Sequence, residues 1–391
     1  MTLAQWCRRS GSGWVLPTGV SRRPPPRLGY FSLVGDGGYL DSASSEPLHP
    51  AAREAMLAAL DQGYADPRRL HPPARNARLI LDNAREAVAE ALGVRRDEVS
   101  FTSSGTDAVH RGLLGLLPPG ATVAHAAVEH SAVLHALAWR PDLKLRSLPV
   151  DATGRVDAER LGTYDVLALQ DANHEVGTIQ PAVGVGTVFR DACASMGRVP
   201  LREGWSAAAG SAHKWGGPAG VGVLLVRQGV RWRNPFPADD RVDGRVSGFE
   251  NVPAALGAAA ALQAVVAERD LVNARQHALV DRIRAAVARI PDTEVVGDAV
   301  VRLPHLVTFS FLYVDGEAIV DALARRGFSV ASGSACTAST LEPSHVLAAM
   351  GALTHGNLRV SLTRDATETE VNAFLAVLPE VVAEIRRDVG M

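Results

Sequence analysis

Short apolar runs alternate along the chain with longer segments in which apolar residues recur at helical spacing. Apolar runs bounded by turn residues are typical of buried strands, and strands that alternate with helices are typical of α/β folds. The runs predict strands at 122–126, 166–169, 187–189, 221–226, 306–313, 328–331 and 357–362. The helical spacing predicts helices at 50–62, 74–92, 108–116, 254–268, 272–290 and 317–326. The sequence therefore predicts an α/β fold.

The length and composition predict two domains. The chain has 391 residues, of which 47% are hydrophobic, and this is enough for two buried cores. We expect a large domain at 36–260 and a smaller α+β domain at 261–391. Residues 1–35 contain no Asp or Glu and include the run Pro24-Pro25-Pro26. Because they lack the apolar core of a secretory signal, we expect a disordered extension there.

Charge and cysteine usage exclude several classes of function. The formal net charge of −2 gives no electrostatic reason to expect binding to nucleic acid or to an anionic membrane. No apolar run approaches the ~20 residues that span a bilayer. Cys7, Cys193 and Cys336 form no Cys-x-x-Cys spacing, which argues against a disulfide framework and against a metal site. We therefore expect a protein of a reducing compartment, the cytoplasm.

Lysine occurs only at Lys144 and Lys214, and Lys214 lies in a glycine-rich segment just before an apolar strand. Arginine stays protonated in proteins, whereas a desolvated lysine can lose its proton and form a Schiff base with a carbonyl compound. Lys214 is therefore a candidate for covalent catalysis. The alternative is a surface lysine on a loop.

A second candidate segment is the run of small polar residues from Ser103 to Asp107, at the start of a predicted helix. Small residues let the backbone approach an anion, and the free N–H groups and dipole at a helix start favour phosphate. Gly105 and Thr106 are therefore candidate phosphate ligands. Ser, Thr and Asp are also ordinary helix N-caps, so a capping role alone is the alternative.

Three further residues have chemistry that a catalytic site could use. His130 begins a helix, where an imidazole with a pKa near 6.5 can exchange protons or simply cap the helix. Cys336 lies in a loop of small polar residues, which favours a reactive thiol over a buried core cysteine. Arg359 is a single arginine in a strand, where it could clamp a carboxylate or lie at a sheet edge.

Taken together, these segments and several others resemble the cysteine desulfurases, which are pyridoxal 5′-phosphate (PLP) enzymes of the class V aminotransferase family. The loop around Cys336 is similar to that of the group I members, which have the longer catalytic loop. The segments that carry the resemblance are Tyr39-Leu40-Asp41, Ser103 to Asp107, Glu129-His130, Asn173 to Gly177, Asp191-Ala192, Ser211 to Gly222, Ser332 to Cys336 and Arg359-Val360-Ser361.

The resemblance implies a fold and a set of site residues. The fold would be fold type I of the PLP-dependent transferases, with a mostly parallel seven-stranded sheet in the large domain and a smaller C-terminal domain that carries the Cys336 loop. Lys214 would carry PLP and remove the substrate Cα proton. The other implied contacts are Gly105, Thr106, Ser211 and His213 to the phosphate, His130 and His174 to the ring, Asp191 to the pyridine nitrogen, and Asn173 and Arg359 to the substrate.

The resemblance also implies a reaction and partners. L-Cysteine would become L-alanine, and its sulfur would remain on Cys336 as a persulfide. A sulfur-acceptor protein, such as an iron–sulfur scaffold or a thiolation enzyme, would then receive the sulfur. The family also implies a homodimer.

The chain departs from the family pattern at several positions. His174 replaces an asparagine, Ala194 replaces a glutamine, and Phe249 replaces a threonine that reaches the cofactor phosphate of the partner subunit. The crossover before the strand at 187–189 is also short, by about ten residues, so we expect a peripheral helix to be lost. Two alternatives therefore stay open: another class V PLP enzyme, such as a selenocysteine lyase or an aminotransferase, and a degenerate scaffold whose activity depends on a partner.

Overall fold

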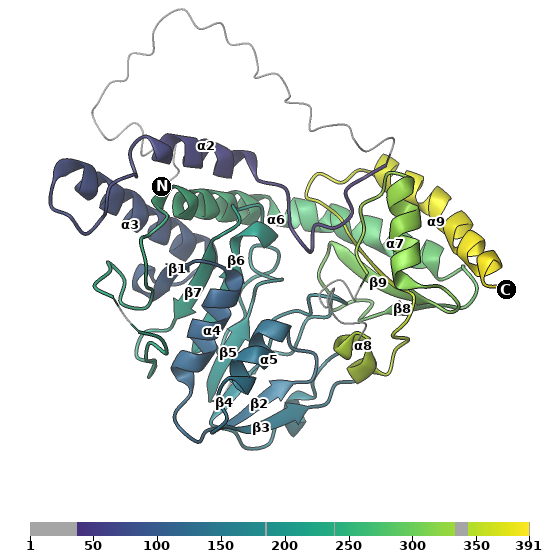
Figure 1. Ribbon diagram of the computed structural model, residues 1–391, viewed down its shortest axis with the longest axis horizontal. Helices are drawn as coiled ribbons and strands as arrows, with labels where there is room; N and C mark the ends of the chain where they lie inside the picture. Colours follow the sequence, from purple (N-terminus) through teal and green to yellow (C-terminus); the bar gives the residue numbers. More distant parts are fainter. Residues whose placement is uncertain (1–36, 184–185, 238, 333–342, 391) are drawn as a thin grey trace, which may run out of the picture. The chain divides into compact units, whose positions relative to one another are not determined.

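The computed structural model describes residues 37–183, 186–237, 239–332 and 343–390. Its larger sheet has seven strands in the order β1-β7-β6-β5-β4-β2-β3, and β7 alone runs antiparallel to its neighbours (Figure 1). The expected mostly parallel seven-stranded sheet is thus confirmed. Its strands are β1 (Val99–Thr102), β2 (Thr122–Ala126), β3 (Lys144–Leu148), β4 (Val166–Ala168), β5 (Thr187–Asp191), β6 (Ala207–Ser211) and β7 (Gly222–Val226).

Both faces of this sheet are buried under helices. Successive side chains of a strand point to opposite faces, so Ala208 of β6 packs with α3 and α6 while Ala207 and Ala209 pack with α4 and α5. Burial on both faces explains why β7 reads as a continuous apolar run. The helices are α2 (Pro50–Leu60), α3 (Pro72–Leu92), α4 (Gly105–Leu116), α5 (Ser131–Ala138) and α6 (Val252–Val287).

A second, smaller sheet is antiparallel, with the strand order β10-β9-β8. Helices α7 and α9 and the second half of α6 bury its apolar side chains. Leu40 belongs to the same core, so the first described residues of the chain pack on the second sheet. The elements are β8 (Thr293–Val296), β9 (Leu306–Phe311), α7 (Gly316–Arg325), α8 (His345–Met350), β10 (Asn357–Ser361) and α9 (Glu368–Asp388).

Two sequence predictions of elements were wrong. The predicted helices at 254–268 and 272–290 are one continuous helix, α6, because residues 269–271 include no glycine or proline that would end it. The predicted strand at 328–331 forms only isolated bridges, from Ser329 to Tyr39 and from Ala331 to Arg359. The domain boundary that we proposed near residue 260 falls inside α6.

The connection between β4 and β5 is short, as expected. Residues 169–183 and 186, the described part of this connection, form no helix. The predicted extension at 1–35 lies outside the described residues. Within the described part of the chain, no helix is long and apolar enough to cross a membrane.

Candidate active site

Most of the predicted site residues line one pocket, which has a cavity volume of about 190 Å³. It lies beyond the ends of β5 and β6 and the start of α4, the edge at which α/β sheets commonly bind ligands. The predicted residues that line it are Gly105, Thr106, His130, His174, Asp191, Ser211, His213, Lys214 and Arg359.

One end of the pocket is built to receive an anion. Gly105 and Thr106 begin the 12-residue helix α4, where backbone N–H groups have no partner within the helix. A Cβ on Gly105 would lie 2.6 Å from Ser211 Cβ and 2.7 Å from Ser211 Oγ, so glycine is required for this approach. Ser211 Oγ lies 3.1 Å from His213 Nδ1. This arrangement favours binding of a phosphate group.

Asp191 ends β5 and lies 6% exposed at the wall of the pocket. One carboxylate oxygen, Oδ1, accepts a hydrogen bond from the N–H of Cys193 at 3.0 Å, which fixes the side chain in the turn after the strand. A buried carboxylate in this position can stabilise a protonated ring nitrogen of a bound ligand.

His130 caps helix α5 and lines the pocket. Its Nδ1 accepts the N–H of Ala132 at 3.1 Å, so the neutral ring carries its proton on Nε2. Burial is the main cause that lowers the pKa of His130 below its ordinary value, and the nearby Lys214 lowers it further against the opposing effect of Asp191. His130 is therefore a neutral hydrogen-bond donor at neutral pH.

His174 packs edge-on against His130, with ring centroids 4.8 Å apart and an interplanar angle of 75°. Burial is the main cause that holds the pKa of His174 well below its ordinary value, and the positive charge of Arg359 lowers it further. Its Nδ1 is buried and has no hydrogen-bond partner among the described residues. Because buried polar atoms are normally satisfied, this nitrogen is available to a ligand in the pocket.

Arg359 reaches the pocket from β10 in the second sheet. Its Nη1 donates to the carbonyl of His174 at 3.0 Å. Its Nη2 donates to Asp41 Oδ1 at 2.9 Å and to Ser44 Oγ at 2.6 Å. The guanidinium is thus held in place by the start of the folded chain, and its buried Nε has no partner among the described residues. A fixed guanidinium of this kind is suited to bind a carboxylate.

Lys214 follows β6 in a single turn of 3₁₀ helix, Ala212–Lys214. Its Nζ donates to the carbonyl of Ala43, and the residue lines the pocket. The turn depends on glycine, because Gly216 has φ +81° and a Cβ on Gly217 would lie 2.9 Å from Ala212 Cβ. The glycines noted in the sequence thus place the lysine at the pocket.

Asn173, a predicted substrate ligand, does not line the pocket. Its Oδ1 accepts the N–H groups of Glu175 and Val176, both at 2.8 Å, and its Nδ2 donates to the carbonyl of Val128 at 3.1 Å. The side chain is fully buried and holds its own loop together. The structure therefore gives Asn173 a local structural contact where substrate binding was predicted.

Cys336 lies outside the described residues, and the described chain resumes beside the pocket at residues 343–345. Ser344 Oγ donates to Glu175 Oε2 at 2.8 Å, and His345 Nε2 lies 2.9 Å from the carbonyl of Glu129. Glu175 and Glu129 are the chain neighbours of the two pocket histidines. Ser344 and His345 therefore contact the chain immediately next to His174 and His130.

Several residues in or beside the pocket were not predicted from the sequence. Asp41 was noted only as part of a family segment, although it binds Arg359 directly. Ser44, Gln170 and Cys193 line the pocket itself. A polar residue just after a predicted strand was the available signal for Gln170.

Comparisons with known proteins agree with this geometry. Residues 38–374 match the model of the aminotransferase class-V family. The IscS-like cysteine desulfurase of Mycobacterium tuberculosis (strain ATCC 25618 / H37Rv) is 36% identical over 382 residues, which cover 89% of this chain and 97% of the relative. The cysteine desulfurase NifS of Azotobacter vinelandii is 34% identical over 374 residues, or 89% of this chain and 93% of the relative.

A solved structure gives the same result at the level of the fold. A NifS-like protein superposes on this chain with a TM-score of 0.81 and 28% sequence identity, covering 88% of this chain and 99% of that chain. The family match spans most of the chain, including both sheets and the pocket. This chain therefore belongs to the aminotransferase class-V family.

Proposed function

We propose that this protein is a PLP-dependent cysteine desulfurase that converts L-cysteine to L-alanine and retains the sulfur as a persulfide on Cys336. The observation that carries the proposal is the convergence of three groups on one pocket: the amine of Lys214, the carboxylate of Asp191 and the guanidinium of Arg359. The relatives of this chain that are named cysteine desulfurases support the same activity.

The pocket residues fit pyridoxal phosphate. The start of α4 with Ser211 and His213 provides a phosphate cradle, Asp191 suits a pyridine nitrogen, and the unpartnered Nδ1 of His174 can bond a polar ring substituent. Lys214 provides the amine that would hold the aldehyde. When bound, PLP supplies an electron sink for the charge that develops at the substrate Cα.

Each pocket residue then has a role in the reaction. Arg359 binds the substrate carboxylate, which orients the amino acid toward Lys214. Nζ of Lys214 removes the Cα proton. His130 holds a proton on Nε2 at the pocket wall and can donate it there. The edge contact with His174 fixes the orientation of the His130 ring.

The thiolate of Cys336 is the nucleophile in this proposal. It attacks the substrate sulfur, so that an S–S bond forms while the substrate C–S bond breaks. The electron pair of the broken bond stays on carbon, which takes up a proton to give L-alanine. Cys193 also lines the pocket, but burial and the neighbouring Asp191 raise its pKa well above the ordinary value and keep it a thiol.

The persulfide requires a sulfur acceptor, and we infer that this is a protein, such as an iron–sulfur scaffold or a thiolation enzyme. We also infer that the chain works as a homodimer. The nucleophilic thiol must be free and reduced before each turnover, so we place the reaction in the cytoplasm, where thiols are kept reduced.

The test is an assay with L-cysteine and a reductant that measures sulfide and alanine. Lys214→Ala should abolish both products and the visible absorbance of bound cofactor. Cys336→Ala should keep that absorbance and lose nearly all of the sulfide, because only the nucleophile is removed.

Matched controls are Lys144→Ala, at the exposed position on β3, and Cys7→Ala. Both should behave as the wild type. A wild-type protein with no visible absorbance after loading with PLP would favour the degenerate scaffold. Selenide production from selenocysteine with little sulfide from cysteine would favour a selenocysteine lyase.

A further inference from the structure

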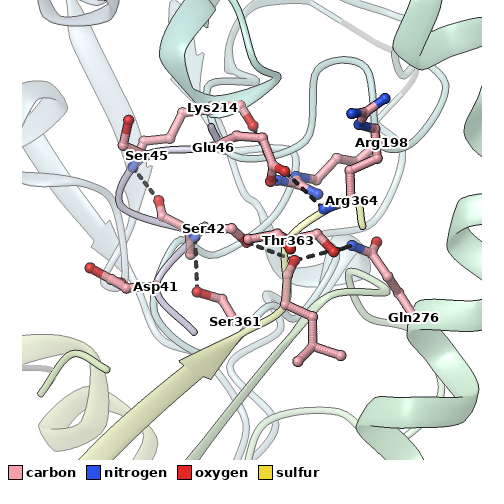
Figure 2. Close-up of polar contacts among 12 residues, drawn as sticks. Asp41, Ser42, Ser45, Glu46, Arg198, Lys214, Gln276, Ser361, Thr363 and Arg364 are labelled. Carbon is pink, nitrogen blue, oxygen red and sulfur yellow. Dashed lines mark hydrogen bonds and ion pairs between the residues drawn. The ribbon is translucent and has the colours of Figure 1, made fainter. Parts of the chain in front are cut away.

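The turn that carries Lys214 is hydrogen-bonded to the segment at residues 43–49, part of which is drawn in Figure 2. The N–H of Glu46 donates to the carbonyl of His213 at 2.8 Å, and the N–H of His49 donates to the carbonyl of Gly216 at 2.8 Å. Lys214 is therefore flanked on both sides by backbone hydrogen bonds to one neighbouring segment. The contact of its Nζ with Ala43 belongs to the same segment.

A buried ion pair completes this support. Arg198 Nη2 donates to the carbonyl of Lys214 at 3.1 Å and to Glu46 Oε2 at 2.8 Å (Figure 2). The two side chains are only 8% and 7% exposed. Asn273 of α6 donates to the carbonyl of Arg198 at 2.7 Å and so fixes the arginine in turn. Neither Arg198 nor Glu46 lines the pocket itself.

Glu46 also connects the lysine to the second sheet. Its Oε1 accepts the N–H of Arg364 at 2.8 Å, just beyond the end of β10, the strand that carries Arg359. Ser42 strengthens this connection, because its Oγ donates to the carbonyl of Leu362 at 2.8 Å. The Glu46 carboxylate therefore accepts hydrogen bonds from two groups: the Arg198 guanidinium, which binds the Lys214 carbonyl, and the backbone N–H of Arg364, just beyond the strand of Arg359.

We propose that Glu46 and Arg198 are positioning residues, which hold the Lys214 backbone so that Nζ points into the pocket in register with Arg359. The inference rests on the proposed function, because it assumes that Lys214 binds the cofactor aldehyde. A buried charge that loses its partner is strongly destabilising, so the pair is expected to stay closed in the folded protein. Loss of the bond to the Lys214 carbonyl would let the turn shift, and shifts of about 1 Å can cost 10²-fold in rate.

The test measures how fast Lys214 captures the cofactor. Protein freed of cofactor is mixed with PLP, the adduct is fixed by borohydride reduction, and its mass at Lys214 is followed with time. The variants are Arg198→Met, Arg198→Lys, Glu46→Gln and the double variant Glu46→Gln/Arg198→Met. The double variant removes both charges, so it should fold even if Arg198→Met does not.

The matched control is Arg85→Met. Arg85 is a buried arginine of α3 whose side chain is 10% exposed and which pairs with Asp82 at 3.0 Å. The Arg85→Met substitution removes a guanidinium that is about as buried as that of Arg198, at a position outside the pocket. Thermal unfolding of each variant separates a general loss of stability from a specific effect on Lys214.

We expect adduct formation at least tenfold slower in Arg198→Met and in the double variant, a partial recovery in Arg198→Lys, and a rate within twofold of wild type in Arg85→Met. If the double variant captures PLP as fast as the wild type, the positioning role is wrong while the proposed function stands. If the wild type itself forms no adduct at Lys214, both are wrong.

Discussion

His130 is at once a helix cap and a pocket residue. Its Nδ1 satisfies a backbone N–H of α5, and this contact fixes the tautomer of the ring. Histidines also cap α2 and α3, at His49 and His71, and neither of these lines the pocket. From its place in the sequence, His130 could either cap a helix or exchange protons. In the structure it caps α5 and also lines the pocket.

Glu175 has an unusual ionisation that leads to a prediction about pH. Burial raises its pKa from 4.5 to about 7, against the lowering effect of the hydrogen bond from Ser344. A pKa raised on folding favours the folded state at low pH, and this contribution is lost as the pH rises from about 4.5 through 7. Deprotonation of Glu175 therefore costs stability at pH 8.

We predict that Glu175→Gln becomes more stable than the wild type as the pH rises. A pKa shift of this size lowers the free energy of unfolding of the wild type by up to about 3 kcal/mol at high pH, because one pKa unit is worth about 1.4 kcal/mol. Urea unfolding at pH 5 and pH 8 measures the difference, which should be small at pH 5 and favour the variant at pH 8. A difference that does not change with pH would contradict the raised pKa.

Gly105 gives a second prediction at this scale. In Gly105→Ala, the new Cβ would collide with Ser211, so the start of α4 must move away from β6. We expect a loss of about 1–3 kcal/mol in the free energy of unfolding and a weaker hold on PLP, measured by dialysis.

The control for Gly105 is Gly244→Ala, because a Cβ on Gly244 meets no atom within 4 Å. This control should change neither quantity. If Gly105→Ala retained PLP as well as Gly244→Ala does, the phosphate cradle at α4 would be wrong.

At the scale of elements, regular apolar runs predicted strands well. Strands whose residues are small or exposed were not predicted. The strand predicted at 122–126 is β2 itself, because its apolar side chains are buried against helices. β6 was not predicted, since its run Ala-Ala-Ala-Gly-Ser has no β-branched residue and forms a strand only through pairing with β5 and β7. β3 was missed because it is a largely exposed edge strand.

The gap predicted within α6 has a physical cause. The first half of the helix buries Ala258 and Leu262 against the large sheet, and the second half buries Leu279 and Ile283 against the small one. The apolar pattern breaks where the buried partner changes, although the backbone remains helical. The apolar periodicity shows only which side chains are buried. The change of packing partner, from the large sheet to the small one, therefore looked in the sequence like the end of one helix and the start of another.

We predict that a proline in this gap is strongly destabilising. Leu271 is 76% exposed, so Leu271→Ala should cost little, whereas Leu271→Pro should cost about 3 kcal/mol by breaking the helix. Denaturant unfolding measures both. Equal stability of the two variants would show that residues 269–271 are a linker, as the sequence suggested.

At the scale of the whole molecule, the pocket joins segments that are far apart in the chain. Asp41 and Ser44 bind Arg359, and Lys214 and Asp191 come from the large sheet. Local motifs identified most of these residues, because small residues and a helix start have a recognisable chemistry. No sequence pattern indicated that Asp41 binds Arg359, since that contact depends on how the second sheet meets the first residues of the fold.

The unbroken helix α6 has a consequence for substrate selection. It packs on both sheets, so it acts as a strut that sets the span between the amine on one sheet and the guanidinium on the other. A rigid connection of this kind would fix the distance between the group that holds the amine of the substrate and the group that holds its carboxylate. We therefore expect α-amino acids to be preferred over β-amino acids such as β-alanine, in which the amine and the carboxylate lie farther apart.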